Sequence, residues 1–254
     1  MSLYKNDKLD YLHHSIESVL NQTFKDFKFY IQLDGKIPTE TLNYLSSIDD
    51  KRLIINKRDV NKGLAASLNE LLKIVLPLNY IYIARMDADD ICKIDRFAKQ
   101  TLFLDMNNNH HLVGSNAIII DENSKDIGKK KVKHQFNFSD MLKKCELIHP
   151  SVMFRNEFFD KVGFYDESLT KSQDYDLWLR ALNLGVKMCN LNEALIKFRY
   201  DPNLIERRKK EQKFNIIIKK KFLQGVKLWI ALIPNILIII LPTFILKFIL
   251  NSKN

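Results

Sequence analysis

Three carboxylates follow a short apolar run in the first half of the chain. The run Tyr80–Ala84 leads through Arg85 into MDADD, which supplies Asp87, Asp89 and Asp90. Mg²⁺ and Mn²⁺ prefer oxygen ligands and leave coordination positions open for substrate phosphates. We therefore expect Asp89 and Asp87 to hold a Mg²⁺ or Mn²⁺ ion that bridges a diphosphate, with Asp90 in a structural role. A solvated acidic turn is the competing interpretation, because Asp is a common turn residue.

A second acidic group opens a predicted helix. In SQDYDLWLR, Asp174 and Asp176 stand ahead of Trp178. Asp near a helix N-terminus can simply stabilise the helix dipole. The functional alternative is a general base that removes a proton from an incoming hydroxyl. Trp178 beside such a base would help to exclude water.

An alternation of helix and strand patterns supplies the scaffold for these acids. The patterns predict helices over 10–21, 39–48, 64–75, 139–145 and 173–184, strands over 28–33, 52–55, 80–84, 112–120 and 151–154, and a solvated basic loop over 125–133. This order is typical of an α/β fold with a Rossmann-like, mostly parallel sheet flanked by helices. Ligands bind beyond the carboxyl ends of such strands. Two strands end in acids, at Asp34 and Asp87, so the site should lie between them.

The net charge narrows the class of binding partner, and the cysteines bear on disulfide and zinc sites. The formal net charge of +10 favours an anionic partner. The chain shows no helix-turn-helix, zinc-finger spacing or aromatic RNA-binding motif, so no nucleic acid is expected. The three cysteines lack CxxC spacing and predict neither a disulfide framework nor a zinc site.

The C-terminal part has the composition of a membrane-associated segment. Residues 204–225 read as a basic, amphipathic linker and residues 226–254 as an apolar, helical, membrane-associating tail. The uncharged run Leu228–Leu246 is long enough for a hydrocarbon core of about 30 Å, although Pro234 and Pro242 interrupt it. A buried core helix is the alternative. Flanking lysines favour the cytoplasmic side, and the N-terminus has no signal-peptide pattern.

Seven ordered motifs resemble the family 2 glycosyltransferases with the GT-A fold. They are MSLYKND, SIESVLNQTFKDFKFYIQLDG, NKGLAASLN, YIARMDADD, HPSVMFRNEFFDKVGFYDE, QDYDLWLR and LIKFR, within residues 1–203. The likeness is closest to bacterial enzymes that build lipopolysaccharide, O-antigen or capsule glycans. It implies that a hexose or N-acetylhexosamine moves, with inversion, from a UDP-sugar to a hydroxyl of a glycan acceptor. The tail suggests a lipid-linked acceptor at the cytoplasmic face of the bacterial inner membrane, with the protein held peripherally or by a single C-terminal anchor.

The resemblance also implies residue roles. Asp174 matches the catalytic base, Asp89 ligates the metal between the phosphates, and Asp87 approaches the ribose or the metal. Asp34 contacts the uracil base, and Ser2 lies beside the nucleotide. Further candidates are Tyr4, Arg58, Asn61, Gly63 and Arg85 for the donor, His149, Trp178 and Arg199 for the acceptor or a lid, and Asp201, where relatives commonly have His, for the metal. Gly63 could equally be a helix-start glycine, and His149 a core or surface histidine.

Two rival interpretations remain. Relatives carry several apolar residues ahead of the first motif, so we expect the first strand to be short, with unpaired backbone groups that weaken the pocket around Ser2. This favours, as the alternative function, a catalytically inactive, truncated, membrane-associated binding or assembly module of the same fold. A sugar-phosphate nucleotidylyltransferase is disfavoured, because its glycine-rich, arginine-bearing N-terminal loop is missing.

Overall fold

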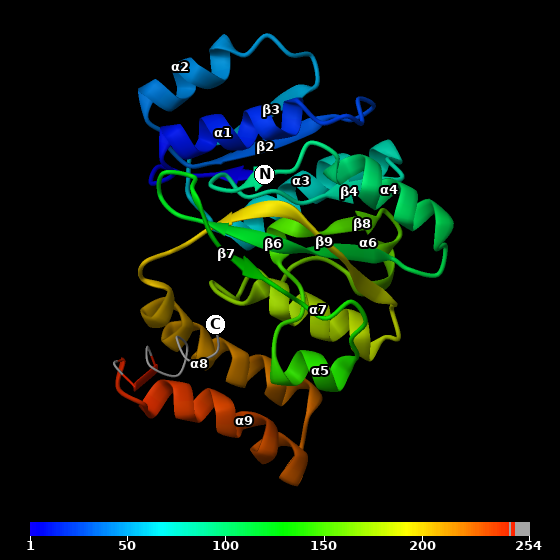
Figure 1. Cartoon of the computed structure of the whole chain (residues 1–254), viewed down its shortest axis with the longest axis vertical. Coiled ribbons are helices and arrows are strands. Elements are labelled where there is room, and N and C mark those ends of the chain that lie inside the picture. Colours follow the sequence, from blue (N-terminus) through cyan, green and yellow to red (C-terminus); the bar gives the residue numbers. More distant parts are fainter. Residues whose placement is uncertain (244, 247–254) are drawn as a thin grey trace.

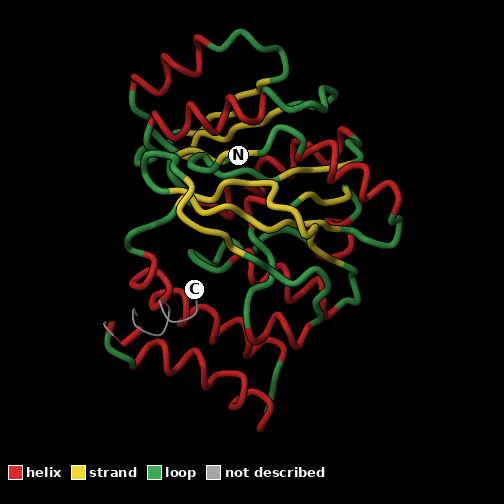
Figure 2. Tube along the Cα trace, in the orientation of Figure 1, coloured by secondary structure: helices red, strands yellow, loops and turns green. Residues whose placement is uncertain are grey.

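Two β-sheets form the centre of the molecule, with helices around them (Figure 2). The structure is a computed structural model that describes residues 1–243, 245 and 246. The first sheet is parallel and has the order β1-β2-β3. The second has the order β4-β8-β6-β9-β5, with β7 on β6. The strands are β1 Ser2–Leu3, β2 Phe29–Asp34, β3 Leu53–Arg58, β4 Tyr82–Ala84, β5 Ile91–Cys92, β6 Leu112–Ile120, β7 Asp126–Lys130, β8 Met153–Arg155 and β9 Met188–Arg199.

The prediction of a mostly parallel sheet is right for the first sheet and wrong for the second. In the second sheet β6 and β9 are parallel, whereas β4–β8, β6–β8, β6–β7 and β5–β9 are antiparallel. The predicted basic loop over 125–133 is also wrong for its first half, because β7 pairs Lys130 with Ala117 and Lys129 with Ile118. Residues 126–129 are exposed, so the apolar alternation that marks a half-buried strand is missing from this edge.

The five predicted helices are confirmed to within a few residues. The helices are α1 Leu9–Leu20, α2 Thr39–Ser47, α3 Leu64–Val75, α4 Arg96–Met106, α5 Phe138–Lys143, α6 Phe158–Val162, α7 Gln173–Asn183, α8 Leu204–Phe222 and α9 Gly225–Ile240. Two short 3₁₀ turns cover Leu76–Leu78 and His149–Ser151. The elements β5, α4, α6 and β9 were not predicted.

The positions of the apolar side chains explain how α1 and α7 are packed against the core. Leu12, Ile16 and Val19 of α1 are buried, at positions that fall on one helical face. In α7, Trp178 has no exposed surface and packs face to face on Phe154 of β8, with 5.8 Å between the ring centroids. Burying a large apolar side chain contributes roughly 1.5–3 kcal/mol. The first turn of α7, which carries a site candidate, is therefore held firmly against the core.

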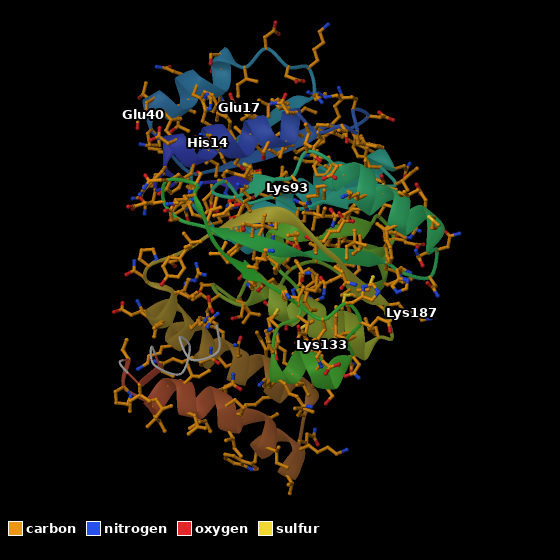
Figure 3. All side chains as sticks on the ribbon, viewed as in Figure 1. His14, Glu17, Glu40, Lys93, Lys133 and Lys187 are labelled. Atoms are coloured by element: carbon orange, nitrogen blue, oxygen red, sulfur yellow. The ribbon has the colours of Figure 1, made fainter. Side chains whose placement is uncertain are left out.

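Helices α8 and α9 pack against each other at the end of the molecule remote from α2 (Figure 1). Figure 3 shows Glu17 of α1 and Glu40 of α2 at that opposite end. Between α8 and α9, Lys219 Nζ donates to Asn235 Oδ1 at 2.6 Å, and Asn235 Nδ2 donates to Gln212 Oε1 at 2.7 Å. These buried polar contacts fix the pairing of the two helices.

The apolar run that was predicted to cross a membrane is not one continuous helix. Helix α9 ends at Ile240 and contains Pro234, so the run Leu228–Leu246 is not one helix. Among residues 1–243, 245 and 246, no helix is both long enough and apolar enough to cross a bilayer. The rest of the predicted tail, residue 244 and residues 247–254, lies outside the described part of the chain.

Candidate active site

The acidic cluster lies in the loop between β4 and β5. One carboxylate oxygen from each of Asp87, Asp89 and Asp90 lies within 4.8 Å of the other two. Two neighbouring elements hold the backbone of this loop. Ser15 Oγ of α1 donates to the Asp87 carbonyl at 2.8 Å, and Arg199 Nε of β9 donates to the Asp89 carbonyl at 2.8 Å. The three carboxylates are therefore gathered by contacts that do not use the carboxylates themselves.

The chemistry of the cluster fits a hard divalent cation. Asp90 is buried, and its Oδ1 accepts the Arg199 backbone N–H at 2.8 Å, whereas its buried Oδ2 has no partner in the described part of the chain. Burial and the Asp87 carboxylate raise the pKa of Asp89 to about 6. Burial and the Asp89 carboxylate likewise raise the pKa of Asp90. Like charges at close range oppose ionisation, and a Mg²⁺ or Mn²⁺ ion would remove that opposition.

Arg85 lies behind the cluster and forms an ion pair with Asp87. Its side chain is 5% exposed, so this cation is held in the protein interior beside the loop. Arg96, which sequence reasoning missed, supports the same segment. Its fully buried guanidinium donates to the Arg85 carbonyl at 2.9 Å. The cation at Arg85 offsets part of the negative charge of the cluster.

Asp34, Arg58, Asn61 and Gly63 come together at the end of β2. The Asp34 carboxylate accepts from Arg58 Nε at 3.1 Å, from Arg58 Nη2, from Lys62 N at 2.8 Å and from Gly63 N at 2.9 Å. Four donors match the acceptor capacity of a carboxylate. In this arrangement Asp34 holds the loop ahead of α3, and its predicted contact with uracil stays a prediction that requires a donor to be released. Gly63 is a helix-start glycine with φ of +88°.

The loop after β1 carries a carboxylate that interacts with the cluster. Ser2 pairs with Gln32 in the parallel ladder, and Tyr4 N–H donates to Asp7 Oδ2 at 2.8 Å. Burial raises the pKa of Asp7 to about 7, and the Asp89 and Asp87 carboxylates act in the same direction. Asp7 was not predicted as a site residue. Asp7, which accepts the Tyr4 N–H, therefore lies within electrostatic range of Asp89 and Asp87.

Asp174 occupies the first turn of α7, as predicted. Burial raises the pKa of its carboxyl, the Arg85 cation lowers it, and Asp87 adds a smaller upward shift. A carboxylate near the cluster with a raised pKa is suited to accept a proton from a hydroxyl. The charges of Arg85 and Asp87 both act on Asp174, so the base candidate lies within electrostatic range of the acidic cluster.

Trp178 and His149 do not line an open pocket. Trp178 is fully buried, so the prediction that it contacts the acceptor is wrong. Position 178 lies one turn after Asp174, on the face of α7 that points into the core. His149 is 8% exposed, and its Nε2 lies 2.9 Å from the Tyr165 hydroxyl. Burial and the Arg85 cation lower the pKa of His149 well below its usual range, so it is a neutral core histidine.

Arg199 joins two loops, and Asp201 differs from its predicted role. The Arg199 guanidinium donates to the carbonyls of Asp89 and Asp121 and to Ser124 Oγ, which makes it a clamp between two loops, and its place in a lid or acceptor site stays a prediction. Asp201 stands apart from the acidic cluster found in the described residues. Its carboxylate pairs with Arg207 at 3.0 Å and accepts the Asn203 N–H at 2.8 Å. Asp201 therefore stabilises the turn that precedes α8.

Asp176 is a further residue whose role was not foreseen. It is fully buried and accepts from Arg180 Nε at 2.8 Å and from Lys221 Nζ of α8 at 2.8 Å. The spacing of Asp176 and Arg180 is the helical i,i+4 spacing that favours ion pairs, and that signal was readable in the sequence. The contact with Lys221 was not readable, because it joins two distant segments.

Several known proteins are similar to this chain in sequence. An uncharacterised glycosyltransferase of Methanocaldococcus jannaschii is 33% identical over 98% of this chain and 91% of its own length. The O-antigen biosynthesis glycosyltransferase WbnJ of Escherichia coli is 33% identical over 78% of this chain and 77% of its own. The UDP-Gal:alpha-D-GlcNAc-diphosphoundecaprenol beta-1,3-galactosyltransferase of Escherichia coli is 29% identical over 82% and 75%.

Solved structures agree on the fold. Staphylococcus aureus TarS 1-349 in complex with UDP-GlcNAc has a TM-score of 0.64 at 13% identity, covering 93% of this chain and 71% of that one. The mannosyltransferase PcManGT of Pyrobaculum calidifontis, in complex with GDP-Man and Mn²⁺, has a TM-score of 0.65 at 11% identity, covering 93% and 68%. The family description Glycosyl transferase family 2 matches residues 2–163. The chain belongs to glycosyltransferase family 2 and has a GT-A-like α/β fold.

Proposed function

We propose that this glycosyltransferase moves a hexose or N-acetylhexosamine, with inversion, from a UDP-sugar to a hydroxyl of a glycan acceptor in the synthesis of a cell-surface polysaccharide. The observation that carries the proposal is the cluster of three carboxylates, in which Asp90 Oδ2 is buried and has no partner among the described residues, with Asp174 within electrostatic range of it. A base and a cation site in one region of the protein are what a transfer from a sugar diphosphate requires.

Asp174 supplies the proton acceptor. As the acceptor hydroxyl oxygen bonds to the anomeric carbon, Asp174 takes the hydroxyl proton, and the bond from that carbon to the diphosphate oxygen breaks with its electron pair. Attack from the face opposite the leaving group inverts the anomeric centre. The raised pKa of Asp174 makes it a stronger base than an exposed carboxylate.

The acidic cluster and its supports hold the donor. Asp89 and Asp87, joined by Asp90, for which the sequence suggested only a structural role, would bind Mg²⁺ or Mn²⁺, which would offset the charge that collects on the leaving diphosphate. Ser2 and Tyr4 are assigned to the uridine side, together with the loop that Asp34 and Arg58 fix. Support for a UDP-sugar comes from the relative whose name includes UDP-Gal and from the TarS complex with UDP-GlcNAc.

The acceptor is assigned as a lipid-linked glycan at the cytoplasmic face of the bacterial inner membrane. The relative named for a diphosphoundecaprenol acceptor supports this class. The surface of α9 supports the location, since Val226, Trp229 and Ile240 are 74%, 67% and 72% exposed. An apolar helix face of this kind next to a cationic helix is typical of a helix lying in an anionic interface.

A donor panel tests the proposal. Purified protein is incubated with Mn²⁺ and each of several UDP-hexoses and UDP-N-acetylhexosamines, and UDP release is measured with and without a lipid-linked glycan acceptor. We expect one donor class to give acceptor-stimulated release that stops on chelation and in Asp89→Asn. Release that is equal in Asp89→Asn, or absent with every donor, would refute the catalytic assignment and favour the inactive module.

A further inference from the structure

A basic side chain from β7 lies over the end of β9. The Lys130 ammonium is 4.9 Å from the centroid of the Phe198 ring. The residue after Phe198, Arg199, donates its backbone N–H to Asp90 of the acidic cluster at 2.8 Å. Lys130 is half-buried, and the charges of Asp174 and Asp90 both act on it. The ammonium therefore lies within electrostatic range of the base candidate and of the acidic cluster.

Helix α8 brings a second cation to the same place. It follows β9 along the chain (Figure 1), and Arg207 near its start pairs with Asp201 at 3.0 Å. The next residue, Arg208, is also half-buried. Burial lowers the pKa of Lys130, and the Arg208 cation acts in the same direction. Two cations from separate elements are therefore close enough to repel each other.

The two cations lack the carboxylate partners that other basic residues on β7, β9 and α8, or close to them, have. Those paired residues are Lys133 with Asp140, Lys197 with Asp126, and Lys221 with Asp166 and Asp176. In the part of the chain that the structure describes, neither Lys130 nor Arg208 forms an ion pair. Glu211 of α8 pairs with Arg207 at 3.5 Å and acts on Arg208 only at longer range. Like charges gathered in a half-buried place cost free energy, which a bound anion would offset.

The apolar face of α9 comes close to this pair of cations. Lys209, the neighbour of Arg208, donates to the Leu241 carbonyl at 2.6 Å. Ile240, the last residue of α9, is largely exposed. Figure 1 shows this end of α9 near the first turns of α8. An anion held by Arg208 would therefore lie near an exposed apolar surface.

We propose that Lys130 and Arg208 bind the phosphate that joins an acceptor glycan to its lipid, with the hydrocarbon chain leading to the exposed end of α9. This role for the two cations rests on the proposed function, because it takes Asp174 as the base for the acceptor hydroxyl. An ammonium and a guanidinium both bind phosphate oxygens through charge-assisted hydrogen bonds. The diphosphate of the sugar donor offers the same oxygens, but the cation of the acidic cluster is already assigned to it.

The position of the cations also limits which sugar reacts. The charge of Asp174 acts on Lys130, so a phosphate held at Lys130 lies near the base. The hydroxyl that reaches Asp174 would then belong to a sugar close to the phosphate rather than to the far end of a long glycan. Transfer would therefore take place early in the assembly of the glycan on its lipid.

Calorimetry tests the phosphate site without any measurement of activity. The probe is geranyl diphosphate, with geraniol as its phosphate-free control, and the full chain is first saturated with UDP and Mn²⁺ so that the donor site is filled. We expect Lys130→Met and Arg208→Gln each to weaken binding of the probe by about tenfold or more. The exposed neighbours on the same elements give the matched controls Lys129→Met and Lys210→Gln, which should bind it as wild type does. Equal binding in all five proteins, or no binding to wild type, would overturn the proposal.

Two further arms separate the phosphate of the acceptor from that of the donor and guard against misfolding. The affinity for UDP with Mn²⁺ should be the same in wild type, Lys130→Met and Arg208→Gln, and a matching loss of UDP affinity would assign the cations to the donor and overturn the proposal. Lys130→Arg keeps the charge and should keep binding of the probe, whereas a loss as large as in Lys130→Met would point to packing alone and count against the site. Binding that depends on both cations, in a protein that turns over no donor, would refute the proposed reaction and still support the phosphate site.

Discussion

Lys221 of α8 donates to the buried carboxylate of Asp176 at 2.8 Å, two residues beyond Asp174. The same Nζ also donates to Asp166 at 2.8 Å. Helix α7, which carries Asp174, is thereby tied to the first helix of the α8–α9 pair. We expect Lys221→Met to lower the free energy of unfolding by about 1–3 kcal/mol, because it removes a hydrogen bond to a buried charge. Urea unfolding of the variant, with exposed Lys220→Met as the matched control, measures this. Equal loss in both variants would contradict the tie.

We expect Arg199 to influence the metal affinity of the acidic cluster through its contacts with Asp89 and Asp90, without binding the metal itself. Its guanidinium and backbone N–H hold Asp89 and Asp90. Replacing a residue that orients metal ligands typically weakens affinity 10–100-fold. We expect Arg199→Lys to weaken Mn²⁺-dependent UDP binding in that range, measured by calorimetry, while circular dichroism stays unchanged. The surface variant Lys197→Met of the same strand serves as control, and an unchanged affinity in Arg199→Lys would exclude the clamp role.

Asp174→Asn separates chemistry from donor binding. The amide cannot accept the hydroxyl proton, and general-base catalysis typically contributes 10²–10⁴-fold. We expect kcat to fall by about that factor while the affinity for UDP with Mn²⁺ stays the same. Exposed Asp160→Asn of α6 is the matched control and should retain full activity. Transfer at the wild-type rate in Asp174→Asn would remove it as the base.

Several parts of this architecture were predictable because their causes are local. The helix over α1 follows from Leu12, Ile16 and Val19 at helical spacing, and Asp87, Asp89 and Asp90 lie together because they are near neighbours at a strand end. The apolar pattern of a segment reports that it is buried, whichever element covers it.

Other parts depend on partners that only the fold brings together. The sequence around Trp178 does not show whether this side chain faces the core or the acceptor pocket. A core residue was therefore assigned to the acceptor pocket. Arg199 contacts segments 78 and 110 residues away in sequence, and no spacing within a motif encodes such contacts. Ser15 is a polar residue on the buried face of α1, and that anomaly was a usable sign that it holds another loop.

Lys219 is expected to give the stability a distinctive pH dependence. Burial lowers the pKa of its ammonium to about 8 in the folded protein, against 10.5 for an unperturbed lysine. Between pH 8 and 10.5 the unfolded chain binds more protons at this site, so the contribution of Lys219 to stability rises with pH in that window. Below pH 8 both states are protonated and the contribution is constant. Urea unfolding of wild type and Lys219→Met should therefore show that the free energy of unfolding of wild type increases relative to that of the variant from pH 7 to pH 9.5. A constant difference would contradict the buried ammonium.

The exposed face of α9 leads to the last prediction. The protein has two tryptophans, and Trp178 is buried while Trp229 is 67% exposed. In Trp178→Phe, fluorescence therefore reports on α9 alone. We expect a blue shift with vesicles that contain phosphatidylglycerol and little shift with phosphatidylcholine, because α8 adds positive charge beside the apolar face.

In that background, Ile233→Glu should abolish the shift, since Ile233 lies one helical turn beyond Trp229 on the exposed face. Leu102→Glu, at a comparably exposed position on α4, should leave it intact. If the apolar face instead pairs with a second copy of the protein, light scattering will give twice the monomer mass and the vesicles will cause no shift, which would exclude the bilayer as the partner of α9.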